Sequence, residues 1–252
     1  MLIAEDSAVN LKLIVRMLEK RGHKVTTSSN GLEAIEAYKK HRFEIILMDV
    51  QMPEVDGFEA TATIRELEKA SGVHVPIVAM TAHAMKGDRE RCLGAGMDAY
   101  ISKPIKAGEV FETMDRIVKN QESQDRGTAV DVEGAVIDYS AAIRHLEGDV
   151  DLLKEIAEMF LEESPALMDQ MREAASRGDS KTLERAAHTI KGSVGNFAAK
   201  PAFEAAQRLE DIGREGKLDD VAEAYSILER EMEMLKPALA ALGRDTDEDT
   251  DR

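Results

Sequence analysis

Hydrophobic and polar residues follow two different rhythms along the chain. In residues 1–120, short apolar runs alternate with stretches in which apolar residues recur every three or four positions. The first pattern predicts buried strands and the second predicts amphipathic helices. We predict strands at residues 2–5, 23–28, 43–49, 76–80 and 99–102, and helices at residues 11–20, 32–40, 58–70, 85–93 and 109–119. Five strand–helix units in succession favour an α/β domain with a parallel sheet, written (βα)5.

The second half of the chain keeps only the helical rhythm. We predict helices at residues 141–146, 151–163, 166–176, 181–197, 202–214 and 218–242. Domain 138–242 is therefore expected to be an all-α helical bundle. The polar stretch 121–137 predicts a linker between the two domains, and residues 243–252 predict an acidic tail.

Composition narrows the function classes. The net charge of −16 argues against nucleic acid as a partner, because that binding depends on clustered Lys and Arg. A single cysteine fits a reducing cytoplasm and excludes an internal disulfide. No apolar run approaches the length that crosses a bilayer, so we expect a soluble, cytoplasmic segment without membrane contact. The abrupt opening on an apolar strand is compatible with its being a piece of a larger, membrane-bound protein.

The ends of the predicted strands carry reactive side chains, namely Glu5, Asp6, Asp49, Thr81 and Lys103. Ligands of an open parallel sheet bind outside the carboxyl ends of its strands. Three carboxylates at that edge raise one another's pKa unless a cation neutralises them, and hard oxygen ligands favour Mg²⁺. A carboxylate beside this ion can attack an activated phosphorus to form an acyl phosphate, while a hydroxyl and an ammonium hold the transferring oxygens.

Four segments at these strand ends carry a family resemblance. In chain order they are Ala4-Glu5-Asp6-Ser7, Met48-Asp49-Val50-Gln51-Met52-Pro53-Glu54-Val55-Asp56-Gly57, Met80-Thr81-Ala82-His83-Ala84 and Ser102-Lys103-Pro104-Ile105. They resemble the signatures of the response-regulator receiver domain over about the first 120 residues. The resemblance implies a flavodoxin-like sheet with strand order 2-1-3-4-5.

The same resemblance implies a role for each acidic residue. Asp49 would be the phosphoacceptor. Asp6 and Asp49 would bind Mg²⁺ through their side chains, Gln51 through its carbonyl, and Glu5 through water. A haloacid-dehalogenase-like hydrolase also uses a strand-end aspartate with Mg²⁺, but it requires a second acid where this chain has Gln51, and we set that alternative aside.

Three further receiver positions follow from the resemblance. Lys103 and Thr81 would contact the phosphoryl oxygens, and Lys103 would join Pro104 through a cis peptide. Tyr100 occupies the position of the family's aromatic switch residue, whose ring responds when Thr81 moves onto the phosphoryl group.

The predicted helix 181–197 carries the candidate chemistry of the second domain. Its apolar stripe at spacings of three, four and seven residues leaves His188 on another face, which we expect to be exposed. Lys191, Gly192 and Gly195 share that face. A neutral imidazole is a competent nucleophile toward phosphorus, Lys191 would offset the incoming charge, and the glycines would clear space for a partner.

The run from Ala187 to Phe197 resembles histidine-phosphotransfer (HPt) domains, as do Phe160-Leu161-Glu162 upstream and Leu209-Glu210 downstream. The whole chain thus resembles the C-terminal part of a hybrid sensor histidine kinase. Its partners would be a kinase phosphohistidine as donor and a downstream receiver as acceptor.

No nucleotide-binding motif is visible in the sequence, so we expect no self-phosphorylation from ATP. We therefore predict a two-component phosphorelay protein in which Asp49 accepts phosphoryl and His188 relays it. The alternative is a regulatory interaction module, in which phosphorylated Asp49 controls docking and the helical bundle transfers nothing.

Overall fold

The computed structural model describes residues 1–81, 86–119 and 136–242, and it divides the chain into two compact units, 1–131 and 132–252. Most of the predicted linker 121–137 and the whole predicted tail 243–252 lie outside the described residues. Those boundaries stay predictions.

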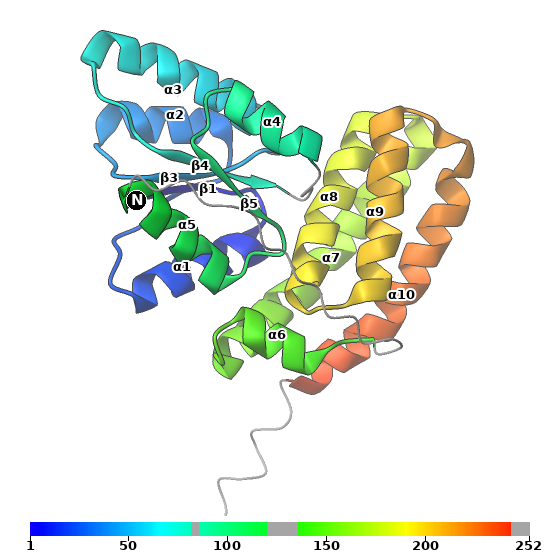
Figure 1. Ribbon diagram of the computed structural model, residues 1–252. Coiled ribbons are helices and arrows are strands. Elements are labelled where there is room, and N and C mark those ends of the chain that lie inside the picture. The colour runs from blue at the N-terminus through cyan, green and yellow to red at the C-terminus, as the bar shows by residue number, and fades with distance from the viewer. Residues whose placement is uncertain (82–85, 120–135, 243–252) are drawn as a thin grey trace, which may run out of the picture. The chain divides into compact units, whose positions relative to one another are not determined.

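The first unit contains a five-stranded parallel sheet in the order β2-β1-β3-β4-β5, which confirms the predicted fold class. Its strands are β1 (Leu2–Ala4), β2 (Thr26–Ser28), β3 (Ile46–Asp49), β4 (Ile77–Thr81) and β5 (Ala99–Ser102). Its helices are α1 (Ala8–Lys20), α2 (Gly31–Lys40), α3 (Gly57–Ser71), α4 (Lys86–Gly94) and α5 (Ala107–Lys119). Helices α1 and α5 cover one face of the sheet, and α2, α3 and α4 cover the other (Figure 1).

The central strands are buried along their whole length, as their apolar sequences predict. Edge strand β2 pairs only with β1 and begins at Thr26, three residues later than predicted. Polar side chains fix the helix starts, because Ser7, Asn30 and Asp56 each accept a hydrogen bond from a backbone N–H in the first turn of α1, α2 and α3.

The loop after β3 folds back onto the strand it leaves. Gly57, the first residue of α3, donates its backbone N–H to the Val50 oxygen at 3.0 Å. A Cβ at this position would lie 2.1 Å from the backbone oxygen of Asp49. Only glycine therefore permits this approach, which closes the loop beside the carboxyl end of β3.

The described residues of the second unit form helices and no strand, as predicted. It consists of α6 (Tyr139–His145), α7 (Val150–Arg177), α8 (Ser180–Asn196), α9 (Lys200–Glu215), a 3-10 turn η1 (Leu218–Asp220) and α10 (Val221–Leu242). Helices α7 to α10 lie side by side, with α6 at one end (Figure 1). Phe160 and Phe197, both fully buried, meet in the core with ring centroids 5.5 Å apart.

Helix α7 corrects one prediction. The segments 151–163 and 166–176 were expected to be separate helices, but α7 runs from one to the other through Pro165 without a break. Proline in a helix removes one hydrogen bond and costs about 3 kcal/mol. Here Pro165 is exposed, whereas Phe160 and Met168 on either side are buried. Continuous packing of one apolar face outweighs the local cost.

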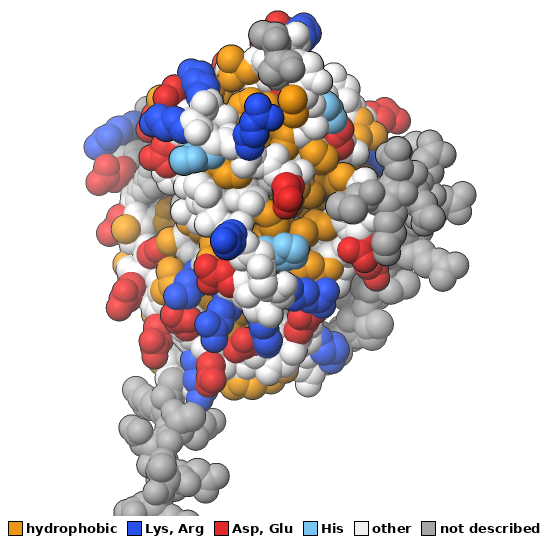
Figure 2. Space-filling model, turned by 90° about the vertical axis from the view of Figure 1, so that its left-hand side faces the viewer, with side chains coloured by type: hydrophobic (Ala, Val, Ile, Leu, Met, Phe, Trp, Pro, Cys, Tyr) orange, Lys and Arg blue, Asp and Glu red, His pale blue; other side chains and the backbone are white. Residues whose placement is uncertain are grey.

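One face of the molecule mixes both signs of charge (Figure 2). On the face drawn in Figure 2, Lys and Arg side chains lie among Asp and Glu side chains, with hydrophobic side chains between them. Among the described helices, none has the length and apolarity that a membrane crossing requires.

We predict that Gly57→Ala destabilises the first unit by about 2–3 kcal/mol, because the new Cβ overlaps a backbone oxygen that cannot rotate away. Hydrogen exchange of the β1 and β3 amides, read by mass spectrometry, measures this loss. Gly108→Ala in α5 is the matched control, since a Cβ there meets nothing within 4 Å. Equal protection in both variants would contradict the prediction.

Candidate phosphoryl sites

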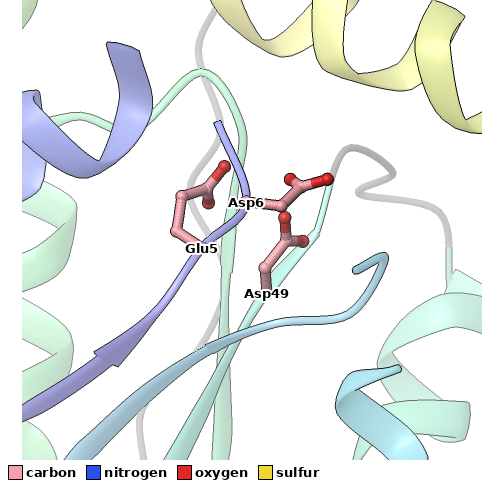
Figure 3. Close-up of side chains that lie close together, drawn as sticks. All are labelled: Glu5, Asp6 and Asp49. Atoms are coloured by element: carbon pink, nitrogen blue, oxygen red, sulfur yellow. The ribbon is translucent and has the colours of Figure 1, made fainter. Parts of the chain in front are cut away.

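Three carboxylates meet at the carboxyl edge of the sheet. Glu5 and Asp6 follow β1 directly, and Asp49 is the last residue of the neighbouring strand β3. Each contributes one oxygen to a group in which all ligand atoms lie within 4.8 Å of one another (Figure 3). The structure thus brings together the three acids that the sequence placed at strand ends, and their oxygens form a donor set that suits Mg²⁺.

Lys103 supplies the cation of this cluster. Its Nζ lies 2.6 Å from Asp49 Oδ2, 2.9 Å from Glu5 Oε2 and 3.1 Å from Glu5 Oε1. The Lys103–Pro104 peptide is cis, as expected. Asp49 and Glu5 are almost completely inaccessible and Lys103 is buried with them, so these charges face one another with little water between them.

The electrostatic balance of the cluster remains negative. Burial raises the pKa of Asp49 well above its ordinary value, and repulsion from Glu5 adds to this, so that Lys103 only partly offsets the two effects. The pKa of Lys103 is raised in spite of its burial, because Asp49 and Glu5 favour its charged form. One ammonium does not neutralise three carboxylates, and a divalent cation fits the remaining charge.

Two neighbours orient the acids. The Asn10 side-chain amide in α1 donates to Glu5 Oε1 at 2.9 Å, and the Gln51 backbone N–H donates to Asp49 Oδ1 at 3.2 Å. The sequence analysis missed Asn10, although its place four residues after Asp6 at the start of an amphipathic helix was a usable signal. This hydrogen bond uses the backbone N–H of Gln51. The proposed role of the Gln51 carbonyl as a metal ligand stays a prediction.

Thr81 and Tyr100 lie on the strands beside Asp49. Thr81 ends β4 directly after Met80, the ladder partner of Asp49, and its carbonyl accepts the backbone N–H of Lys103 at 2.7 Å. Tyr100 in β5 is half-buried and packs against the core of the sheet. The placement agrees with the expected positions, whereas the roles of the two residues in phosphorylation stay predictions.

The second site joins helices α8 and α9. His188 Nδ1 lies 3.0 Å from Glu210 Oε1, and Lys191 Nζ pairs with Glu210 Oε2. Lys191 also donates to Gln207 Oε1 at 3.0 Å, and an Arg214 Nη2 donates to Glu210 Oε1 at 2.8 Å. The Glu210 carboxylate thus contacts the candidate histidine and two cations, Lys191 and Arg214.

His188 was predicted to be exposed, whereas it is buried when both units are present. Its exposed fraction is 3%, and Lys191, Gly192 and Gly195 on the same face are also buried. Helix periodicity identified the apolar stripe correctly, but it does not show a carboxylate arriving from another helix. Glu210 makes burial of the polar face possible, since a buried charge requires a partner.

The charge state of Glu210 defines the histidine tautomer. Burial alone would raise the pKa of Glu210, but the hydrogen bond and charge of His188, together with Lys191, lower it to about 2. Burial lowers the pKa of Lys191, although Glu210 favours its charge. A carboxylate that stays ionised only accepts, so His188 Nδ1 carries a proton, and in the neutral form of the ring the lone pair is then on Nε2.

Comparison with known proteins assigns both domains. The model of the response regulator receiver domain matches residues 1–115, and the model of the Hpt domain matches residues 155–238. The polar-differentiation response regulator DivK of Brucella anthropi is 42% identical over 113 residues, which cover 45% of this chain and 90% of DivK. The chain therefore belongs to the response-regulator receiver family, and its receiver is joined to an Hpt domain.

Some longer relatives align with this chain over both domains. The sensor protein GacS of Pseudomonas syringae pv. syringae is 30% identical over 247 residues, which cover 93% of this chain and 27% of GacS. The chain spans about a quarter or less of the length of the hybrid histidine kinases that it matches. Because the second domain matches an Hpt model, the comparison favours the phosphorelay prediction over the docking-module alternative.

One solved structure is of a receiver domain with its metal. It is the receiver domain of sensor histidine kinase PA1611 from Pseudomonas aeruginosa, described with a magnesium ion coordinated in the active site cleft. It is 41% identical, covers 47% of this chain and 95% of that chain, and has a TM-score of 0.43.

We predict an acid-sensitive stability component from Glu210. Its folded-state pKa lies below the ordinary 4.5, so the ionised form stabilises the bundle above pH 4.5. This stability, about 3 kcal/mol, is lost as the pH falls from 4.5 through about 2. Glu210→Gln should remove the component and lower the unfolding midpoint of the bundle at pH 7, because Lys191 then loses its carboxylate.

Thermal unfolding between pH 7 and pH 2, followed by circular dichroism, measures this effect. Glu215→Gln is the matched control on the same helix, since its side chain is 63% exposed. If Glu210→Gln has the same pH profile as the wild type, the proposed charge state of Glu210 is wrong.

Proposed function

We propose that this chain passes phosphoryl groups in a two-component phosphorelay, with Asp49 and His188 as its two carriers. The observation that carries the proposal is the presence in one chain of two buried groups suited to phosphorus, each oriented by ionic partners. Asp49 lies 2.6 Å from the Lys103 ammonium, and His188 Nδ1 lies 3.0 Å from Glu210. The receiver and Hpt matches support this assignment.

At the receiver site, a carboxylate oxygen of Asp49 attacks the phosphorus of a donor phosphohistidine. The new O–P bond forms as the P–N bond breaks, and the electron pair returns to the donor imidazole. Lys103 already lies beside the attacking group and offsets charge on the transferring oxygens, and the Thr81 hydroxyl supplies a second donor.

The acid cluster also fits a resident Mg²⁺. The Asp6 and Asp49 side chains and the Gln51 carbonyl would hold it, with Glu5 acting through water. When bound, the ion supplies positive charge that neutralises the phosphoryl oxygens. The negative balance around Asp49, with one lysine among three acids, supports this assignment.

At the Hpt site, Nε2 of His188 attacks the phosphorus of a phosphoaspartate. The N–P bond forms as the P–O bond breaks, and the electron pair stays on the leaving carboxylate. Glu210 accepts a hydrogen bond from Nδ1, which holds the proton on that nitrogen, and its negative charge stabilises the positive charge that the ring gains. The same steps in reverse pass the group from His188 to an aspartate.

The proposed partners are a histidine kinase that donates from its phosphohistidine and a downstream receiver that exchanges with His188. Similarity to hybrid kinases over both domains supports a place for this segment on the cytoplasmic side of such a kinase. Transfer between Asp49 and His188 within one chain is part of this proposal.

Labelling with an autophosphorylated histidine kinase and Mg²⁺ tests the proposal. We expect base-labile label on Asp49 and acid-labile label on His188 in the wild type. Asp49→Ala should remove the first label and His188→Gln the second, and His74→Gln, an exposed histidine, is the matched control. Label on Asp49 alone would overturn the assignment of His188 and support the docking-module alternative.

We predict that removal of Mg²⁺ with EDTA lowers the labelling rate of Asp49 at least about 100-fold, because the acid cluster then repels the incoming phosphoryl group. Asp6→Asn should weaken Mg²⁺ binding about 10-fold or more, measured by isothermal titration calorimetry. Asp56→Asn, at the N-cap of α3, is the control. Labelling that proceeds unchanged in EDTA would refute the metal assignment.

A further inference from the structure

The hydrogen bond between His188 and Glu210 depends on the distance between two helices. His188 lies on α8 and Glu210 on α9, so the 3.0 Å contact exists only while these helices pack closely. The buried face of α9 consists largely of small residues, namely Ala202, Ala205, Ala206 and Gly213, beside Leu209 and Glu210. Small side chains allow two helix backbones to approach.

Gly213 marks the tightest described approach on this face. A Cβ at Gly213 would lie 2.6 Å from the backbone nitrogen of Glu184, 2.7 Å from its Cα and 2.8 Å from its Cβ. These atoms belong to or adjoin the α8 backbone and cannot move away by side-chain rotation. Glycine inside a helix costs about 1 kcal/mol relative to alanine, and this contact gives that cost a structural reason.

The contact lies one helical turn from the candidate phosphoryl site on both helices. Gly213 follows Glu210 by three residues, and Glu184 precedes His188 by four. Residues at these spacings share a helix face. A displacement at Gly213 therefore acts directly on the separation of Glu210 and His188.

Arg214 bridges the same two helices by two ion pairs. Its Nε lies 3.3 Å from Glu184 Oε1 on α8, and its Nη2 lies 2.8 Å from Glu210 Oε1 on α9. The guanidinium thus ties together the residue that Gly213 touches and the residue that holds His188.

We propose that the contact between Gly213 and the Glu184 backbone, closed by Arg214, positions Glu210 on His188, which makes Gly213 a positioning residue for phosphotransfer. The inference rests on the proposed function of His188. Ordinary carbon contacts need about 3.5 Å or more, so a methyl group at position 213 would push the helices apart by about 1 Å. A hydrogen bond lengthened from 3.0 to about 4 Å is lost, and Nδ1 then loses the acceptor that fixes its proton.

The test compares the wild-type chain with Gly213→Ala by two readouts. The first is the ¹⁵N chemical shifts of the His188 imidazole, which report whether Nδ1 or Nε2 carries the proton without any phosphotransfer. The second is the rate at which phosphoramidate, a small P–N donor, labels His188. We expect Gly213→Ala to shift the tautomer toward a mixture and to lower the rate about 10- to 100-fold.

Leu239→Ala in α10 is the control for lost stability. Leu239 is buried in the same bundle, so its truncation destabilises the unit without adding atoms between α8 and α9. This control should keep the wild-type tautomer and rate. If Gly213→Ala fails to fold, Arg214→Gln replaces it, since it opens the same contact without adding atoms and should shift the tautomer in the same direction.

Wild-type ¹⁵N shifts and rate in the folded variant would overturn the proposal. So would an equal change in Leu239→Ala, because the effect would then follow stability alone. Absence of label on wild-type His188 would instead refute the proposed function, and the ¹⁵N comparison would still decide whether Gly213 positions Glu210.

Discussion

A buried carboxylate paired with a buried lysine organises each of the two domains. In the receiver, Lys103 bridges Asp49 and Glu5 across the carboxyl edge of the sheet. In the Hpt domain, Lys191 pairs with Glu210 between two helices. A buried charge is costly unless it is paired, so the strands and helices around each pair must pack in the arrangement that keeps its two members in contact. The doubly wound sheet brings the receiver partners together, and the close packing of α8 and α9 does so in the Hpt domain.

Carboxylates outnumber the lysine at the receiver site, whereas cations outnumber the carboxylate at the Hpt site. This difference in net charge matches the chemistry proposed for each site. In the receiver, three carboxylates share one lysine, and the pKa of Asp49 is raised. That site attracts a cation. In the Hpt domain, one carboxylate accepts from an imidazole, a lysine and an arginine, and its pKa falls to about 2. That site leaves positive charge to meet an arriving phosphoryl group.

The sequence predicted the receiver more completely than the Hpt domain for a physical reason. Parallel strands end at one edge, so Glu5, Asp6 and Asp49 are brought together by topology alone, and reading the strand ends was sufficient. Helix periodicity, by contrast, describes one helix at a time. It placed His188 off the apolar stripe but did not show that Glu210 and Lys191 would allow its burial.

Predictions from local sequence patterns also failed where the structure is determined by packing between helices. Two helices were predicted at residues 151–163 and 166–176, but Pro165 between them lies on the exposed side of one helix whose buried face continues past it. Gly213 carried no visible meaning in the sequence, because its constraint comes from the backbone of Glu184, 29 positions earlier in the chain. Contacts of this kind depend on how two helices cross, which single-helix patterns do not specify.

The position of phosphorus on His188 tests the account most directly. A phosphorylated, ¹⁵N-histidine-labelled chain, studied by correlated ³¹P and ¹⁵N NMR, shows which ring nitrogen is bonded to phosphorus. Because Glu210 holds the proton on Nδ1, the account predicts phosphorus on Nε2 of His188 alongside an acyl phosphate on Asp49. Phosphorus on Nδ1, or an acyl phosphate with no phosphohistidine, would contradict it.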